Sequence, residues 1–205
     1  MSETSYRGAV ADPAQIRLLR SPVRQELLDT LAALGGEAGV AALSEQLGRP
    51  ADGLYYHLGA LVRGGLVLEM ERPPGDDRRF RLAGEGSGPF RLAYDLGPQG
   101  NVRELEAFVR GLLQIAARDF DDAVLAESVL VNGPRRELWA SRNKGWLSPD
   151  DIGEVNALLE RLSALTSQPK SPMRTRLMSC AFVLTPIDPR AKRRSPSLKP
   201  NRTSE

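Results

Sequence analysis

Cysteine is nearly absent from the sequence, and its absence narrows the class of protein. The only cysteine, Cys180, has no partner for an intramolecular disulfide, which is typical of proteins from reducing compartments. No apolar run approaches the roughly 20 residues that a membrane-spanning helix needs. The first residues, MSETSYRGAV, also lack the basic and then apolar pattern of a secretory signal. We therefore expect a cytoplasmic protein that does not bind a membrane.

Motifs that would indicate an enzyme are missing as well. His57 is the only histidine, and a lone histidine makes a poor metal site because metal sites need several ligands. The sequence has no glycine-rich phosphate loop, HExxH motif, nucleophile elbow or Cys-x-x-Cys pair. We therefore expect no metal, no cofactor and no enzymatic activity. An enzyme stays open only if the C-terminal half holds converging titratable residues without a recognisable motif.

Charge has to be interpreted locally, because the net charge of the chain is only +2. Hydrophobic residues make up 41% and charged residues 26% of the 205 residues. This composition is typical of a soluble globular protein with one large domain or two small ones.

The segment from residue 16 to residue 65 predicts three or four helices. Ser21 and Pro22 form a good N-cap and first-turn pair, so one helix is expected to stop near Arg20 and another to begin at Pro22. A short helix follows and ends at Gly48, and LYYHLGALVRGGL ends at a glycine pair. The apolar positions of the first part recur every three or four residues: Ile16, Leu19, Val23, Leu27, Leu31 and Leu34.

Two alternating runs follow and predict a β-hairpin. In LVLEMER, Leu66, Leu68 and Met70 alternate with polar or smaller residues, which predicts a half-buried strand with these three on one face. In RRFRL, Phe80 and Leu82 alternate with arginines, and PPGDD between the runs is rich in turn residues. The order of helices and hairpin predicts a winged helix-turn-helix.

Four short motifs follow one another in this segment: Pro22 with Arg24, Leu43 to Gly48, His57-Leu58 with Leu61, and Gly65-Leu66-Val67. In this order they resemble the winged-helix domains of ArsR-like bacterial transcriptional regulators. The resemblance covers about a third of the chain and implies a homodimeric DNA-binding repressor or activator. The second helix lacks the cysteine pair of the metal sensors in that family, which argues against metal sensing there.

DNA contacts are expected on the helix at residues 51–63 and on the wing at residues 72–81. Leu54, Leu58 and Leu61 are spaced to face the core, so the remaining side chains of this helix are offered to base edges and phosphates. The alternatives are that Tyr55 or Tyr56 packs against the wing, and that the wing arginines belong to a solvated, salt-bridged hairpin. The expected DNA-binding residues are Arg49, Ala51, Asp52, Tyr55, Tyr56, His57, Arg63, Arg78 and Arg79.

The C-terminal half predicts helices and one strand. A long amphipathic stretch begins after Asn101, and Ser148 is the expected N-cap of a further helix. RTRLMSCAFVLTP is expected to form one buried strand that includes Cys180. Trp139 and Trp146 could line the cavity of a small-molecule effector of unidentified chemistry, or equally serve core or dimer packing.

The expected fold class is mainly α with a small β component (α+β). A winged helix-turn-helix domain precedes a helical C-terminal dimerisation or effector domain that contains a strand. The expected boundaries are a flexible N-terminus at 1–14, the winged helix at 15–83, a linker at 84–100, the C-terminal domain at 101–188 and a basic disordered tail at 189–205.

The predicted function is sequence-specific binding of double-stranded DNA by a homodimer that regulates transcription at a palindromic operator. Two recognition helices one DNA turn apart would read the two half-sites. The alternative is a winged-helix module for protein interaction and assembly without specific DNA binding, since fold does not fix function. The near-neutral net charge and the acidic residues Asp76 and Asp77 of the wing favour this alternative somewhat.

Overall fold

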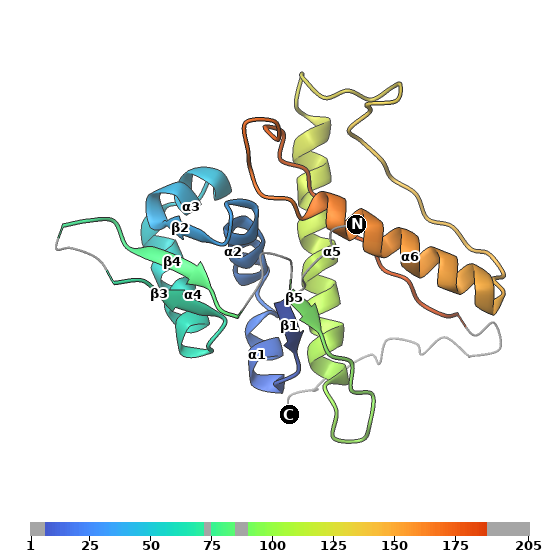
Figure 1. Ribbon diagram of the computed structural model, residues 1–205, viewed down its shortest axis with the longest axis horizontal. Helices are drawn as coiled ribbons and strands as arrows, with labels where there is room; N and C mark the ends of the chain where they lie inside the picture. Colours follow the sequence, from blue (N-terminus) through green and yellow to red (C-terminus); the bar gives the residue numbers. More distant parts are fainter. Residues whose placement is uncertain (1–6, 72–74, 85–89, 188–205) are drawn as a thin grey trace, which may run out of the picture.

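The computed structural model describes residues 7–71, 75–84 and 90–187 of the chain. Helices dominate the fold, and the strands form two small sheets (Figure 1). The elements in chain order are β1 (Arg7–Val10), α1 (Pro13–Leu18), α2 (Pro22–Ala33), β2 (Glu37–Gly39), α3 (Val40–Leu47), α4 (Ala51–Arg63), β3 (Val67–Glu69), β4 (Arg79–Leu82), β5 (Phe90–Leu92), α5 (Val102–Val124) and α6 (Pro149–Thr166).

Helices α2, α3 and α4 and the antiparallel sheet β2-β4-β3 form the winged helix. Phe80 of the central strand β4 is fully buried and lies opposite Ala38 of β2 and Glu69 of β3. Leucines from all three helices fill the space above it, and this burial is the main stabilising contribution of the domain. The fully buried members of the core include Leu27, Leu31, Leu43, Leu54, Leu58, Leu61, Leu66, Val67 and Leu82.

The turn between α3 and α4 is held by both its backbone and a side chain. Gly48 at the C-cap of α3 has a φ of 61°, a left-handed conformation that favours glycine. The hydroxyl of Ser44 donates to the carbonyl of Arg49 at 2.6 Å, and the Arg49 amide donates to the carbonyl of Ser44 at 3.2 Å. These bonds fix the direction in which α4 leaves the turn.

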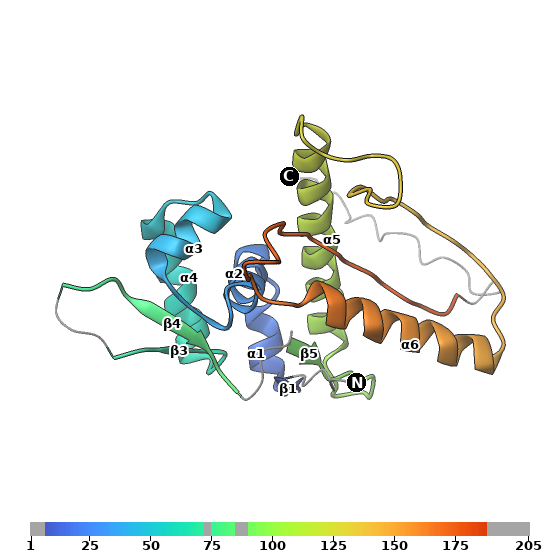
Figure 2. The ribbon, with the colours of Figure 1, turned by 45° about the horizontal axis from the view of Figure 1, so that its top comes forward.

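Helix α5 packs against α1 and α2 and lies between the winged helix and α6 (Figures 1 and 2). Gly111 allows this close approach, because a Cβ there would come within 2.6 Å of Nε2 of Gln25. Gln25 is buried and donates to the carbonyls of Leu19 at 2.6 Å and Phe108 at 3.3 Å. One buried amide therefore ties together the α1–α2 turn, α2 and α5.

Helix α6 extends away from α5 on the side opposite the winged helix (Figures 1 and 2). Its start is well defined: Ser148 and Asp151 form a reciprocal capping box, and Pro149 occupies the first turn. It nevertheless has no buried residue. The chain returns after α6 to place the Lys170 amide 2.9 Å from the carbonyl of Ala33.

Several sequence expectations are confirmed, including the bounds of α4 at residues 51–63, the Ser21–Pro22 helix start and the Ser148 N-cap. The hairpin is also present, but the phase of its first strand was wrong. Within β3, Val67 is buried and Leu68 is exposed. Leu66 is also buried, but it lies before the strand begins and so does not follow the alternation of β3. The short strand β2 was not expected and completes a three-stranded sheet.

The expected flexible N-terminus is wrong for residues 7–14, which contain β1 and the start of α1. Strand β1 pairs in parallel with β5, so part of the expected linker at 84–100 is folded back onto the N-terminus. The expected buried strand at RTRLMSCAFVLTP is also wrong: this segment has no strand, and its residues, Cys180 included, are exposed. The expected basic tail at 189–205 lies outside the described residues.

Candidate nucleic-acid interface

Helix α4 buries one face and exposes the opposite one. Leu54, Leu58 and Leu61 are at most 1% exposed and point into the core of the winged helix. At 100° per residue, Asp52 and Arg63 fall on the opposite side, and both are exposed. Ala51 at the start of the helix is half-buried. The exposed face therefore extends from the first turn of α4 to its last turn.

The two adjacent tyrosines of α4 have different surroundings. Tyr56 is 69% exposed and lies on the outward face. Tyr55 is half-buried, packs against the core, and holds the guanidinium of Arg78 at 5.0 Å from its ring centroid, a distance typical of a cation–π contact. Packing against the wing therefore applies to Tyr55, whereas Tyr56 is available to a partner.

His57 lies at the inner margin of α4, on the side that faces α2. Its Nδ1 is buried without a hydrogen-bond partner among the described residues, and its ring meets Tyr56 edge-on at 5.3 Å. Burial, with the nearby guanidinium groups of Arg24 and Arg49, lowers the pKa of His57. We therefore expect a neutral imidazole at neutral pH, in positively charged surroundings.

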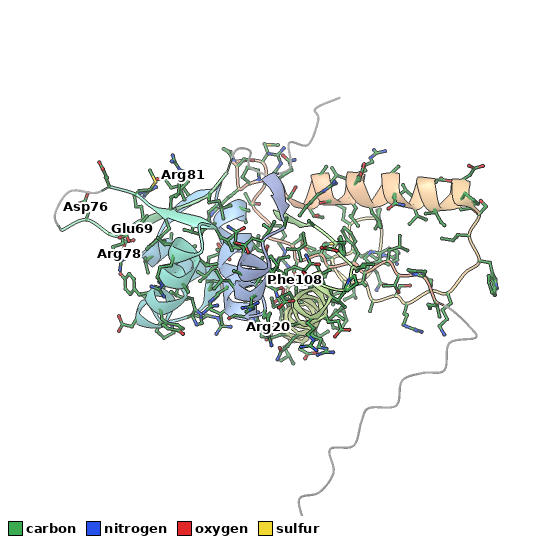
Figure 3. The ribbon with its side chains drawn as sticks, turned by 90° about the horizontal axis from the view of Figure 1, so that it is seen from below. Arg20, Glu69, Asp76, Arg78, Arg81 and Phe108 are labelled. Atoms are coloured by element: carbon green, nitrogen blue, oxygen red, sulfur yellow. The ribbon has the colours of Figure 1, made fainter. Side chains whose placement is uncertain are left out.

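The wing arginines are engaged by carboxylates. Arg78 donates through Nε and Nη2 to both oxygens of Glu69, each at 2.7 Å, and this hydrogen bond raises the pKa of Arg78. Arg79 donates through Nε to Glu37 at 3.0 Å. Figure 3 shows Glu69 and Arg78 together near the wing, with Asp76 further towards its tip. The salt-bridged alternative for these arginines therefore describes the structure.

Asp77 has a role that the sequence did not suggest. Its Oδ2 accepts a hydrogen bond from the Ala41 amide at 3.0 Å, in the first turn of α3, where no residue of the preceding chain caps the helix. A carboxylate is stabilising at a helix N-terminus because the helix dipole is positive there. The wing is therefore anchored to α3, and this carboxylate is directed towards the protein.

Arg49, an expected DNA contact, belongs to an ion-pair network. Its Nη2 lies 3.1 Å from Oε2 of Glu26, whose side chain is only 10% exposed. Arg118 of α5 binds the same carboxylate through both terminal nitrogens and also lies 3.3 Å from Asp119. Glu26 therefore connects the turn between α3 and α4 to α5. Glu26 and Arg118 lie 92 positions apart in the chain, so no local pattern in the sequence could predict that they pair.

The two tryptophans are largely exposed in the part of the chain that the structure describes. Trp139 is 67% exposed and carries the guanidinium of Arg136 on its ring at 3.4 Å, and Trp146 is 91% exposed. Both lie in the irregular segment between α5 and α6. The expectation that they line an effector pocket stays a prediction.

The residues that the structure describes contain neither a metal-binding cluster nor a membrane-spanning helix. No group of three or more His, Cys, Asp or Glu side chains is placed to hold a metal ion there. Within the same ranges, no helix has the length and hydropathy that crossing a membrane would require.

Comparison with known proteins identifies one part of the chain, which lies within the winged-helix region. Residues 18–69 match the family model of a helix-turn-helix domain, so the chain carries such a domain. No similar protein was found among curated sequences. One solved structure, the organohalide-sensing RdhR transcriptional regulator bound to 2,4-dichlorophenol, is 13% identical and aligns over 78% of this chain and 72% of that chain. The TM-score is 0.29, which is too low to support a conclusion about this chain.

Proposed function

We propose that the protein is a sequence-specific DNA-binding transcriptional regulator that acts as a homodimer. The observation that carries this proposal is the two-sided α4 of a helix-turn-helix domain. Its leucine face is fully buried, and its opposite face presents Asp52, Tyr56 and Arg63. A single α-helix fits the major groove of B-DNA, where such side chains can reach base edges and phosphates.

In this proposal the wing lies along the flanking DNA backbone. Arg78 and Arg79 would exchange their carboxylate partners, Glu69 and Glu37, for phosphate oxygens. That exchange costs the ion pairs seen here, but exposed pairs contribute only about 0–1 kcal/mol. Both arginines therefore remain available for DNA, at a reduced net gain.

The C-terminal half supports the dimer. Helix α6 carries an apolar stripe at helical spacing, with Ile152, Leu158, Leu162 and Leu165 all at least 37% exposed. Its capping box and first-turn proline define it as a helix, yet no described segment of its own chain covers the stripe. A second copy, packed α6 against α6 and onto the exposed side of α5, would bury these residues symmetrically. Two copies would also place two α4 helices for a two-fold symmetric operator.

Selection of bound sequences from a random duplex pool tests the proposal. Enrichment of a palindrome with half-sites one helical turn apart would support both specific binding and the dimer. Tyr56→Ala should then weaken binding to the enriched duplex about tenfold or more. Tyr94→Ala, at a tyrosine that is 75% exposed outside the winged helix, is the matched control and should bind as the wild type does. Equal binding by both variants would remove Tyr56 from the reading surface.

A protein-interaction module is the second candidate. The observation that favours it is that both wing arginines are held by carboxylates, which leaves the wing weakly basic. Salt dependence separates the two functions, because DNA binding weakens with a log-log slope of about −0.9 for each phosphate neutralised. A mainly apolar protein interface would show a much shallower dependence. The absence of any enriched duplex, together with capture of a defined protein partner, would favour this candidate.

A further inference from the structure

We propose that the groove between α1, the start of α2 and the outer face of α4 holds a DNA backbone phosphate, with Arg24 and Arg63 as its cationic ligands. This inference rests on the proposed DNA-binding function and changes where the phosphate contacts are expected. They move from the wing to the opposite flank of the recognition helix.

The groove has a volume of about 490 Å³ and opens beside the exposed face of α4. Tyr56 and Arg63 of α4 line it together with Arg24 from the first turn of α2. Gln15 of α1 fixes the far wall, because its Nε2 donates to the carbonyl of Gly64 at 2.8 Å. The absence of a side chain at Gly64 allows this approach, since a Cβ there would overlap Cδ1 of Leu18. The groove is therefore set by the fold.

One donor at the groove lacks an acceptor. Nε of Arg24 is buried and has no hydrogen-bond partner among the described residues. Arg24 makes one long hydrogen bond, from Nη1 to the carbonyl of Leu18 at 3.4 Å. An unsatisfied buried donor is unfavourable in the free protein. An anionic acceptor that binds at this position would remove that penalty.

Charge in the groove is predominantly positive. Among the described residues, no carboxylate forms an ion pair with Arg24 or Arg63. Asp12 is the one carboxylate that lines the groove, and its Oδ1 is engaged as the cap of α1, where it accepts from the Ala14 amide at 2.8 Å. Positive charge that has no partner in the free protein is what a phosphate diester neutralises on binding.

The wing differs on each of these points. The Arg78 fork is bidentate to Glu69, and Arg79 is bound to Glu37. A phosphate at the wing must compete with a carboxylate that is already bound, whereas among the described residues no carboxylate forms an ion pair with either groove arginine. The net gain per phosphate should therefore be larger at the groove.

Binding isotherms of the full chain on a selected duplex and on a scrambled duplex, from about 50 to 200 mM salt, test this assignment. Arg63→Gln and Arg24→Gln should each make the log-log salt slope shallower by about 0.9 and weaken both duplexes alike, by about tenfold at moderate salt. Arg110→Gln removes an arginine of α5 whose side chain is 78% exposed, outside the winged helix, and is the matched control that should keep the wild-type slope. Arg79→Gln, in the wing, tests the competing location and should change the slope by much less than Arg63→Gln does.

Arg24→Lys keeps the charge and should keep the wild-type slope, which separates loss of a phosphate contact from loss of packing. Arg63 is exposed, so Arg63→Gln carries the test alone if Arg24→Gln fails to fold. A wild-type slope in Arg63→Gln with a reduced slope in Arg79→Gln would overturn the inference and would place the main phosphate contacts at the wing. A wild-type protein whose DNA binding does not depend on salt would instead overturn the proposed function, and this inference with it.

Discussion

The winged helix buries its large apolar side chains, whereas the C-terminal half leaves most of its own on the surface. In the part of the chain that the structure describes, every large side chain that is less than 2% exposed lies at or before Leu82. Among the described residues, all the exposed large apolar residues except Tyr56 and Leu68 lie after residue 93. The two regions are therefore stabilised in different ways. The winged helix has a complete core of its own, and the C-terminal half has apolar surface that the described part of its own chain does not cover.

This difference bears on how α6 is stabilised. Isolated helices shorter than about 12–15 residues are marginal in water, and even longer ones depend mainly on packing of an apolar face. Helix α6 has 18 residues and a capping box but no buried residue. Its stability should therefore depend on protein concentration if a second copy supplies the missing surface, whereas the stability of the winged helix should not.

A pair of leucine substitutions should give the largest effect and separate the two regions. Leu58→Ala in α4 removes a side chain that is 0% exposed and should lower the free energy of unfolding by about 2–5 kcal/mol at any protein concentration. Leu158→Ala in α6 removes one that is 58% exposed. It should leave the unfolding of the winged helix unchanged and shift the monomer–dimer equilibrium towards the monomer. Urea titration and sedimentation at two protein concentrations measure both effects.

The comparison would fail if Leu158→Ala destabilised the protein as much as Leu58→Ala without any change in association. The C-terminal half would then have a core within one chain. Equal and small effects of both changes would contradict the core assigned to the winged helix.

Glu26 is where the two regions are joined, and its removal should have the next largest effect. Glu26→Ala leaves Arg49 and Arg118 without their shared carboxylate, which should lower the free energy of unfolding by about 1.5–3 kcal/mol. The matched control is Glu69→Ala, which removes a carboxylate that is 36% exposed from Arg78. That loss should be about 0–1 kcal/mol. Thermal or urea unfolding compares the two variants directly.

Glu26→Ala should also loosen α5 from the winged helix, because the Arg118 contact crosses that junction. Faster hydrogen exchange in α5 and at the start of α4, with the rest of the winged helix unaffected, would show this loosening. Equal losses of stability in Glu26→Ala and Glu69→Ala would mean that the shared carboxylate contributes no more than an exposed pair.

The elements that could be predicted from the sequence are those with local signals. Helix α4 has three leucines at helical spacing and a glycine pair at its end, and its predicted bounds are confirmed. Helix α6 has Ser148 and Pro149 at its start, which need no tertiary contact to act. These signals, together with the alternation of arginine with phenylalanine and leucine in β4, were enough to predict the order of helices and hairpin in the winged helix.

The features that could not be predicted depend on contacts between distant residues. Strand β2 exists because Glu37 to Gly39 pairs with β4, and three residues are too few for a periodic signal. An apolar run such as RTRLMSCAFVLTP has the composition of a buried strand, but burial requires a surface to pack against, and the described part of this chain offers it none. At the candidate interface, nothing local distinguishes Arg49, bound to Glu26, from Arg63, which has no carboxylate partner among the described residues.

The smallest expected effect is a pH dependence at the same junction. Desolvation of its carboxyl group, followed by the nearby carboxylates of Glu26 and Asp119, raises the pKa of Asp29 to about 7. The residue itself is exposed on α2, so solvent screens part of this effect. The folded state then binds more protons than the unfolded state between about pH 4 and pH 7, because the carboxyl of the unfolded chain titrates near the ordinary aspartate value of 3.8. Stability contributed by this site is therefore lost as pH rises through that window.

Asp29→Asn should remove this loss, because an amide stays neutral at every pH. The variant should be more stable than the wild type at pH 8 and closest to it near pH 4, as measured by thermal unfolding across the range. Asp121→Asn on the exposed part of α5 controls for the loss of one negative charge. A stabilisation by Asp29→Asn that is the same at pH 4 and pH 8 would show that packing, and not the charge at the junction of the two regions, is responsible.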